Sequence, residues 1–280
     1  MTFLKFYIKH PCLYYVCVLI FASVAEIFAV LILPPIVNTL MILAILSIVE
    51  IPAIKLLSMQ KMLNNCDPVG YLNMTDELLS GVQVADKIKA LGKQPLISIT
   101  LNRSAAFIQI GRNDDALYLI DFLQRNVPKM SHLFIAAIYN NLSIIYSDKG
   151  DTALAEDFCE RERIEFEENH LSFFVSNRQR KILAELSVKS NKLEIALSKG
   201  DFQLAETLGL DIENLMNLSN VHQLDIKTSV AFDMGAVYFN LKNYNEALPR
   251  LRFAAENGGT TVYVAKAREM LCEINNNQTI

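Results

Sequence analysis

Residues 229–256 read SVAFDMGAVYFNLKNYNEALPRLRFAAE, and this segment has the clearest repeat pattern of the chain. Small Gly235 is followed three residues later by Tyr238, and Ala247 comes twelve residues after the glycine, beyond a short polar turn. Small residues let two helices approach closely, and an aromatic ring fills the space beside them. The stretch therefore predicts two antiparallel helices joined by a tight turn, with Gly235 facing Ala247.

The same spacing occurs at three places upstream. The first two matches have a small residue, an aromatic three residues later, a glycine turn and an alanine; the last match is weaker, with Leu193 where the small residue belongs and Ala196 in the aromatic position. The matched residues are Ser104, Phe107, Gly111 and Ala116; Ser143, Tyr146, Gly150 and Ala155; and Ala196, Gly200 and Ala205. Recurrence of one pattern predicts an array of helical hairpins.

This pattern resembles the tetratricopeptide repeat (TPR) family, over about residues 94–275. The resemblance implies paired helices stacked into a right-handed superhelix with a peptide-binding groove. Two features depart from the family: the chain has no Trp, and its matched alanines are 39, 50 and 42 residues apart, against ~34 in a typical repeat. The extra length falls largely in residues 161–192. Another solenoid of helical hairpins is the alternative.

The resemblance also implies which side chains line the groove, namely those on the first helix of each hairpin. They are mostly apolar and include no Lys or Arg, which favours an apolar helix or extended segment as ligand over a terminal carboxylate. The alternative is that the chain's own helices, at 76–91 or at the C-terminus, cover them. The groove candidates are Leu101, Ala105, Ile108, Asn140, Ile144, Ser147, Ser190, Glu194, Leu197, Phe232, Ala236 and Phe239.

The rest of the chain after residue 63 also has helical periodicity, so the expected class is all-α. Residues 64–93 are expected to form a connector and a capping helix, and residues 94–280 the repeat domain. Thr75 is predicted to open the capping helix, Gly92 to close it, and Pro95 to lie in the first turn of the next helix.

Residues 1–63 contain two long apolar segments, at 13–33 and 36–54, with one charge in each. Each is near the ~20 residues that a helix needs to cross a bilayer. Pro34 and Pro35 separate them and force a break. Residues 1–63 are therefore expected to form a transmembrane hairpin. The alternative is a signal peptide cleaved near Ala25, followed by a core helix.

Lysines flank the hairpin on its outer ends, at positions 5, 9, 55 and 61, and the turn has none. The positive-inside rule then predicts a multi-pass cell-membrane protein whose soluble domain is cytoplasmic. Glu26 and Glu50 are the two acids within the apolar segments. Glu50 is expected near the interface, and Glu26 is either packed within the hairpin or in contact with another membrane protein.

Charge and motifs exclude several function classes. Removing residues 1–63 from the totals of 26 basic and 30 acidic residues leaves 22 against 28, an excess of acid that argues against a nucleic-acid partner. The five Cys and four His lack metal-ligand spacing, and no catalytic motif is present. No enzyme activity, cofactor or metal is expected. The charged run 160–168 is interpreted as a solvated helix face, with a docking surface as the alternative.

The favoured function is a membrane-anchored adaptor or scaffold that binds a partner protein or peptide in the TPR-like groove. The alternative is an accessory subunit of a membrane transporter or secretion complex, docked through the transmembrane hairpin.

Overall fold

The computed structural model describes residues 58–79, 94–127, 129–168, 177–219 and 223–278, and these residues form helices and short turns with no strand among them. Residues 58–64 are helical. The longer helices are α4 (Pro68–Leu79), α6 (Gln94–Gln109), α7 (Asn113–Asn126), α8 (His132–Asp148), α9 (Thr152–Glu168), α10 (Asn177–Lys199), α11 (Phe202–Ser219), α12 (Leu224–Asn240), α13 (Tyr244–Asn257) and α14 (Val262–Gln278). The all-α prediction is confirmed for this part of the chain.

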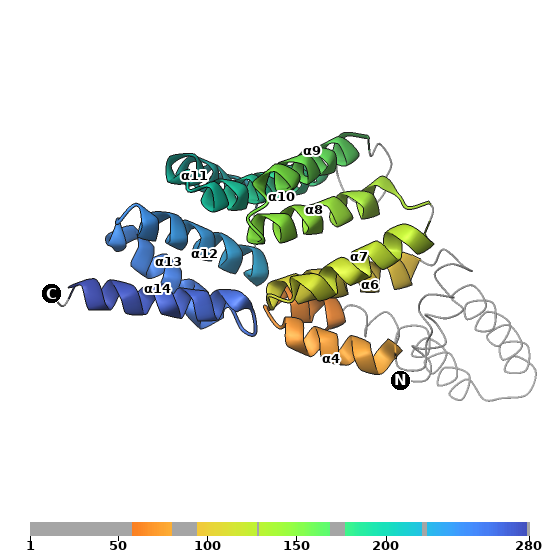
Figure 1. The fold of residues 1–280 in the computed structure, drawn as a ribbon, viewed down its shortest axis with the longest axis horizontal. Coiled ribbons are helices and arrows are strands. Elements are labelled where there is room, and N and C mark those ends of the chain that lie inside the picture. The colour runs from red at the N-terminus through yellow and green to blue at the C-terminus, as the bar shows by residue number, and fades with distance from the viewer. Residues whose placement is uncertain (1–57, 80–93, 128, 169–176, 220–222, 279–280) are drawn as a thin grey trace, which may run out of the picture.

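The helices pack as sequential hairpins: α6 with α7, α8 with α9, α10 with α11, and α12 with α13 (Figure 1). The first helices also contact one another, since α8 lies against both α6 and α10, and α12 contacts α10 and α14. We call α6, α8, α10, α12 and α14 the inner layer. Stacked hairpins of this kind are the arrangement of a helical repeat solenoid.

The hairpin turns share one hydrogen-bonding scheme. In the turn after α8 the backbone N–H of Asp151 donates to the Tyr146 carbonyl at 2.9 Å, and Gly150 has φ +77°. The turn after α12 repeats the bond from Asn243 to Tyr238 at 2.9 Å, with Lys242 at φ +58° in the position of the glycine. A left-handed residue with this bond is the Schellman ending of a helix. The predicted breaks at Gly111, Gly150 and Gly200 are confirmed as such turns.

Small residues lie between the two helices of a hairpin, as the sequence pattern predicts. Ser143 Oγ of α8 donates to the Ala155 carbonyl of α9 at 2.9 Å, across the twelve-residue spacing. In the last hairpin a Cβ on Gly235 would come within 2.8 Å of the Leu251 side chain, one turn beyond fully buried Ala247. The glycine is therefore required for the close approach of α12 and α13, and its contact in α13 is Leu251.

Ala247→Leu is expected to lower the free energy of unfolding by ~1–3 kcal/mol, because a larger side chain must displace well-packed neighbours. Ala247 has no exposed surface. Thermal unfolding followed by circular dichroism measures the effect. Asn245→Leu places the same side chain at an exposed position of α13 and serves as control. Equal melting temperatures for the two variants would contradict the assigned packing.

The irregular repeat length has a structural origin in the third hairpin. Helix α10 has 23 residues, whereas α8 and α12 have 17 each. The additional residues of α10 lie at its N-terminal end. The spacing from Ala196 to the Gly200 turn and Ala205 is therefore the same as in the other repeats. The long interval between matched alanines thus reflects extension of α10 together with the connection at 169–176, which lies outside the described residues.

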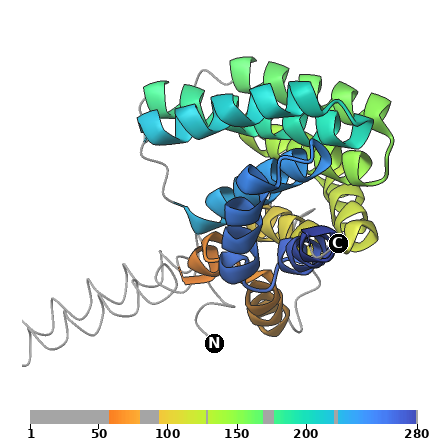
Figure 2. The same cartoon turned by 90° about the vertical axis from the view of Figure 1, so that its left-hand side faces the viewer.

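The first part of the array meets the turn that precedes its last helix (Figure 2). The Thr260 backbone N–H donates to the Cys66 carbonyl at 2.9 Å, and the Val69 N–H donates to Thr260 Oγ1 at 3.3 Å. Buried Cys66 also lies 3.7 Å from Thr228 Oγ1. We call these contacts between residues 66–69 and the α12 and α13–α14 segments the closing junction. It connects the first helices of the array to the last.

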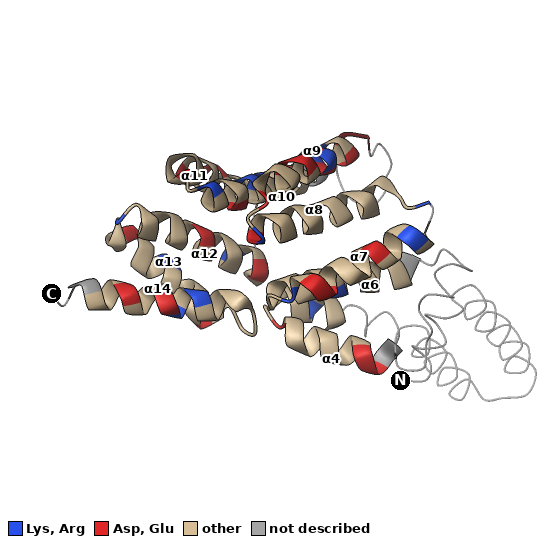
Figure 3. Cartoon of the chain, in the orientation of Figure 1, with Lys and Arg blue, Asp and Glu red and all other residues tan. Residues whose placement is uncertain are grey.

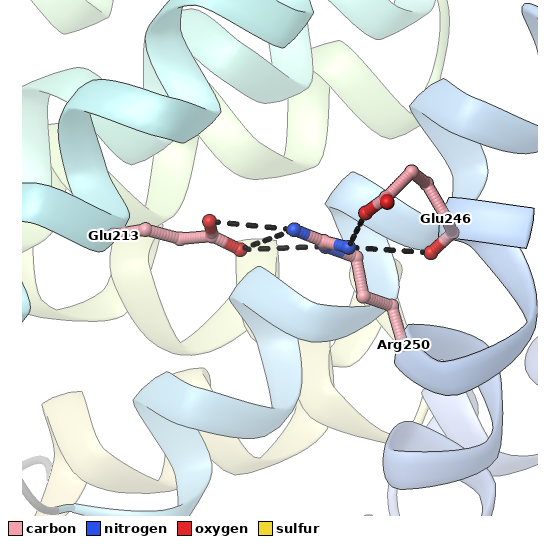
Figure 4. Close-up of polar contacts among 3 residues, drawn as sticks. All are labelled: Glu213, Glu246 and Arg250. Atoms are coloured by element: carbon pink, nitrogen blue, oxygen red, sulfur yellow. Dashed lines mark hydrogen bonds and ion pairs between the residues drawn. The ribbon is translucent and has the colours of Figure 1, made fainter.

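An ion-pair cluster connects the α10–α11 hairpin to the α12–α13 hairpin (Figure 4). Arg250 of α13 pairs with Glu246 of its own helix at 2.6 Å and with Glu213 of α11 at 3.4 Å. Its guanidinium also lies 4.9 Å from the centre of the Tyr238 ring. Both side chains remain partly exposed to solvent, so the pair joins α11 to α13 but contributes little to stability.

Two predictions near the N-terminus need separate comment. The capping helix was expected to begin at Thr75, but α4 begins at Pro68 and Thr75 lies inside it. Asp67 Oδ1 accepts the Gly70 N–H at 2.9 Å at the true helix start, and Thr75 Oγ1 donates back to the Leu72 carbonyl at 2.9 Å. Pro95 lies in the first turn of α6, as predicted. Gly92 and the segments 13–33 and 36–54, with Glu26 and Glu50, lie outside the described residues.

Candidate partner-binding pocket

A pocket of about 270 Å³ opens between α6, α8, α9 and α10. Its mouth includes Leu133, whose side chain is 54% exposed although it is large and apolar. Among the lining residues that the structure describes, none is Lys or Arg. The lining consists of Ser98, Leu101, Asn102, Leu133, Phe134, Ala137, Asn140, Glu162, Phe166 and Ser187.

Glu162 lies at the floor of this pocket and has no exposed surface. Its Oε1 accepts from the Ser187 hydroxyl at 2.5 Å, and its Oε2 accepts from Asn191 Nδ2 at 2.6 Å. Burial raises the pKa of Glu162 to about 7, and the hydrogen bonds from Ser187 and Asn191 oppose this rise. Burial dominates because the neighbours supply dipoles and no positive charge.

Asn140 of α8 completes this polar network. Its Oδ1 accepts from Asn191 Nδ2 at 3.0 Å and lies 3.1 Å from Ser187 Oγ. Since a hydroxyl has one proton, Ser187 donates either to the ionised Glu162 or to Asn140. In the second case a protonated Glu162 donates to Ser187. The network therefore satisfies Glu162 in both protonation states, and it fixes α8, α9 and α10 around the pocket.

The predicted groove residues do not all reach this pocket. Leu101 and Asn140 line it. Ile108, Ser147, Phe232 and Ala236 are buried, and the remaining candidates are partly buried along the inner layer: Ala105, Ile144, Ser190, Glu194, Leu197 and Phe239.

The two aromatic candidates at the C-terminal end each pack against another ring. The Phe232 ring lies 5.2 Å from the ring of Tyr263 in α14, and the Phe239 ring lies 6.1 Å from that of Tyr244. Phe232 is therefore covered by the last helix, which is one of the two alternatives that the sequence leaves open.

Glu162 was not singled out from the sequence, because it lies in the charged run interpreted as a solvated face. That interpretation describes its neighbours well, since Arg163 pairs with Glu160 and Glu167 on the surface. The spacing of residues in α9 nevertheless indicated that Glu162 is buried. Ala155, Cys159 and Glu162 are spaced by four and three residues, and these are the buried positions of α9.

Helix α8 differs from its neighbours in charge. Between His132 and Ser147 it has no Lys, Arg, Asp or Glu, whereas α9 carries many (Figure 3). The uncharged helix faces the pocket, and the charged helix α9 turns Glu162 toward it. This difference explains why the pocket combines an apolar mouth with an acidic floor.

His132, Glu165 and Glu168 form a second cluster at the open end of the α8–α9 hairpin. One ligand atom of each lies within 4.8 Å of the others, a spacing that could hold a metal ion. His132 Nδ1 lies 2.7 Å from Glu165 Oε2 and 3.7 Å from Glu168 Oε2. His132 and Glu168 are exposed, and an exposed His–carboxylate pair accounts for these distances.

Comparison of the chain with protein-family models, with curated protein sequences and with solved structures found no match. The class of protein is therefore assigned from the described fold alone. It is an all-helical array of stacked antiparallel hairpins, consistent with a repeat solenoid. No helix among the described residues is both long enough and apolar enough to cross a bilayer.

Proposed function

We propose that this chain is a membrane-anchored adaptor whose TPR-like domain binds a segment of a partner protein in the pocket between α6, α8, α9 and α10. The observation that carries the proposal is the pocket itself, where exposed Leu133 stands beside Phe134, Phe166 and a buried carboxyl. An exposed apolar side chain at the mouth of a pocket with few, fixed polar groups is typical of a recognition site. The hairpin array supports it, because stacked repeats commonly present such surfaces.

The membrane anchor in this proposal is the apolar pair of segments at 13–33 and 36–54, and the flanking lysines favour a cytoplasmic position for the domain. The polypeptide reaches the domain at residue 58 and enters the closing junction by Cys66. This short distance favours a domain held close to the bilayer. It also gives weight to the alternative function, an accessory subunit of a membrane transporter or secretion complex.

Site-specific photo-crosslinking in the full chain tests the adaptor function. A photoreactive residue in place of Leu133 is expected to crosslink a discrete partner protein in cells that express the chain. Leu218 of α11 is the matched control, since it is apolar, 77% exposed and not part of the pocket lining. Crosslinking of the same products from both positions, or of none from Leu133, would reject the pocket as the binding site.

Leu133→Ser supplies the quantitative counterpart of this experiment. Loss of an apolar anchor that is a hot spot costs ~2 kcal/mol of binding, so the affinity for the crosslinked partner should fall by roughly 30-fold, which is measured as lower recovery of the complex. The melting temperature of the chain should stay nearly constant because the side chain is half exposed. Leu218→Ser should leave recovery unchanged.

A further inference from the structure

The polar floor of the pocket offers more hydrogen-bond acceptor sites than it has protons to fill them. An ionised Glu162 has roughly four lone-pair sites, and Asn140 Oδ1 has two more. The protons directed at these sites are the one of the Ser187 hydroxyl and the two of the Asn191 amide. The floor can therefore accept further hydrogen bonds from an occupant of the pocket.

The negative charge of Glu162 also lacks a positive partner. In the part of the chain that the structure describes, Glu162 forms no ion pair, and the pocket lining there contains no Lys, Arg or His. Its pKa responds to burial and to the hydrogen bonds from Ser187 and Asn191. A buried carboxylate without a cation is costly to the fold, and groups of this kind are concentrated at functional sites.

Two members of the network are accessible from the pocket. Asn140 and Ser187 are partly exposed and line it, whereas Glu162 lies behind them with no exposed surface. When Ser187 donates to Glu162 at 2.5 Å, the bond from Asn191 is the one that remains to Asn140 Oδ1. A donor inside the pocket can then bond to Asn140 Oδ1 and to Ser187 Oγ, with the Glu162 charge one hydrogen bond further in.

The apolar walls lead from the mouth to this floor over a short distance. His132 Nδ1 lies 2.7 Å from Glu165 Oε2, so the start of α8, with exposed Leu133, is level with Glu165 of α9. Glu162 is three residues from Glu165, which is roughly 4.5 Å along the helix axis. The flexible four-carbon stem of a Lys side chain is long enough for that distance and packs well on apolar walls such as Phe166.

We propose that the pocket receives a Lys side chain of the partner segment, whose ammonium group donates to Asn140 and Ser187 in front of ionised Glu162. The stem of this Lys packs against Leu133 and Phe166 at the mouth. The inference rests on the proposed function and specifies the chemistry of the partner. An ammonium is a compact group with three donors, which suits a floor rich in acceptors.

Fluorescence anisotropy on the purified full chain in neutral detergent tests the inference. The probe is a tetramethylrhodamine-labelled peptide with one Lys between two Leu residues, compared with the same peptide carrying norleucine, which has the stem of Lys without the ammonium. At pH 8 we expect the Lys peptide to bind at least ~10-fold more tightly. Equal or tighter binding of the norleucine peptide, or no binding of either at about 1 mM, would overturn the inference.

Glu162→Gln removes the charge behind the floor and should weaken binding of the Lys peptide by about 10-fold or more. The variant is expected to fold, because a neutral group of the same shape replaces a buried charge. Glu160→Gln is the matched control, since it removes one exposed acid from the same helix, and should change the affinity by less than about twofold. Equal losses in both variants would show that the peptide follows net charge, and the inference would fail.

The pH dependence of binding distinguishes a cationic occupant from a neutral one. Since the pKa of Glu162 is about 7, the Lys peptide should bind about 10-fold more tightly at pH 8 than at pH 6. A neutral occupant would bury the charge further and bind more weakly as the pH rises. The other titratable groups nearby are His132 of α8, Cys159 and Glu165 of α9, and Lys192 of α10, and α6 contributes none to the lining. His132→Gln should keep the pH dependence and Glu162→Gln should abolish it, and the opposite pattern would overturn the inference.

The crosslink at Leu133 separates this inference from the function on which it rests. If Leu133 crosslinks a cellular partner equally well in the parent and in Glu162→Gln, the adaptor function stands and the Lys side chain is rejected. If the Lys peptide binds as expected but Leu133 crosslinks nothing, the pocket binds Lys side chains and the adaptor function fails. Loss of both the peptide affinity and the crosslink in Glu162→Gln, with both retained in Glu160→Gln, supports the inference and the function together.

Discussion

Glu162→Gln is expected to raise the free energy of unfolding by about 3 kcal/mol above pH 7 and to have little effect below pH 4. Burial raises the pKa of Glu162 in the folded chain to about 7 from a usual value of 4.5. As the pH rises between these values, the unfolded state releases its proton first, so the parent loses stability across that window and stays at the lower value above it. Gln is neutral throughout and reproduces the hydrogen bonds of the protonated acid.

Denaturant unfolding of parent and variant from pH 4 to pH 8 measures this difference directly. Other buried acids, such as Asp233, titrate in the same range, but they are common to both chains and cancel in the comparison. Glu256→Gln on the surface of α13 is the control and should leave the two curves parallel. A difference that does not change between pH 4 and pH 8 would contradict the buried, uncompensated carboxyl.

Gly259→Ala is expected to cost about 3 kcal/mol and to open the closing junction. Gly259 has φ +56°, and a Cβ there would come within 2.1 Å of the Cys66 carbonyl oxygen. The backbone conformation alone costs ~1–2 kcal/mol for a residue with a side chain, and the contact with rigid backbone adds an overpacking cost of similar size. The chain relieves the contact by separating residues 66–69 from the α13–α14 turn.

Gly150→Ala separates these two contributions. Gly150 has φ +77°, but a Cβ there would meet nothing within 4 Å, so only the conformational cost of ~1–2 kcal/mol applies. Opening of the junction is read from the thiol of Cys66, which is 1% exposed in the parent. Maleimide labelling should increase at Cys66 in Gly259→Ala and stay low at buried Cys159 in every variant. If both glycine variants are equally stable, the ends of the array are not in contact as described.

The helical hairpins and their turns were predictable from the sequence because they depend on neighbours close in the chain. A glycine in the left-handed conformation and a small residue twelve positions before an alanine both act within one hairpin, as Ser143 and Ala155 illustrate. The predicted start of α4 was wrong because a contact with another helix decides the role of Thr75. Thr75 has the side chain of a capping residue, but it bonds to the Leu72 carbonyl and to Arg103, so packing against α6 decides its role.

The all-α class, the positions of the turns and the two helices of each hairpin follow from the amino-acid sequence, because helical periodicity and turn chemistry depend on residues close in the chain. Which inner-layer side chains stay exposed depends on the packing of the hairpins against one another. Tyr263 of α14 covers Phe232, and Glu162 of the charged run lies at the pocket floor. Cys66 is hydrogen-bonded to Thr260 from the other end of the array. The physical reason is that burial and electrostatic environment depend on residues from distant repeats, and periodicity within one helix carries no information about which of its faces another repeat will cover.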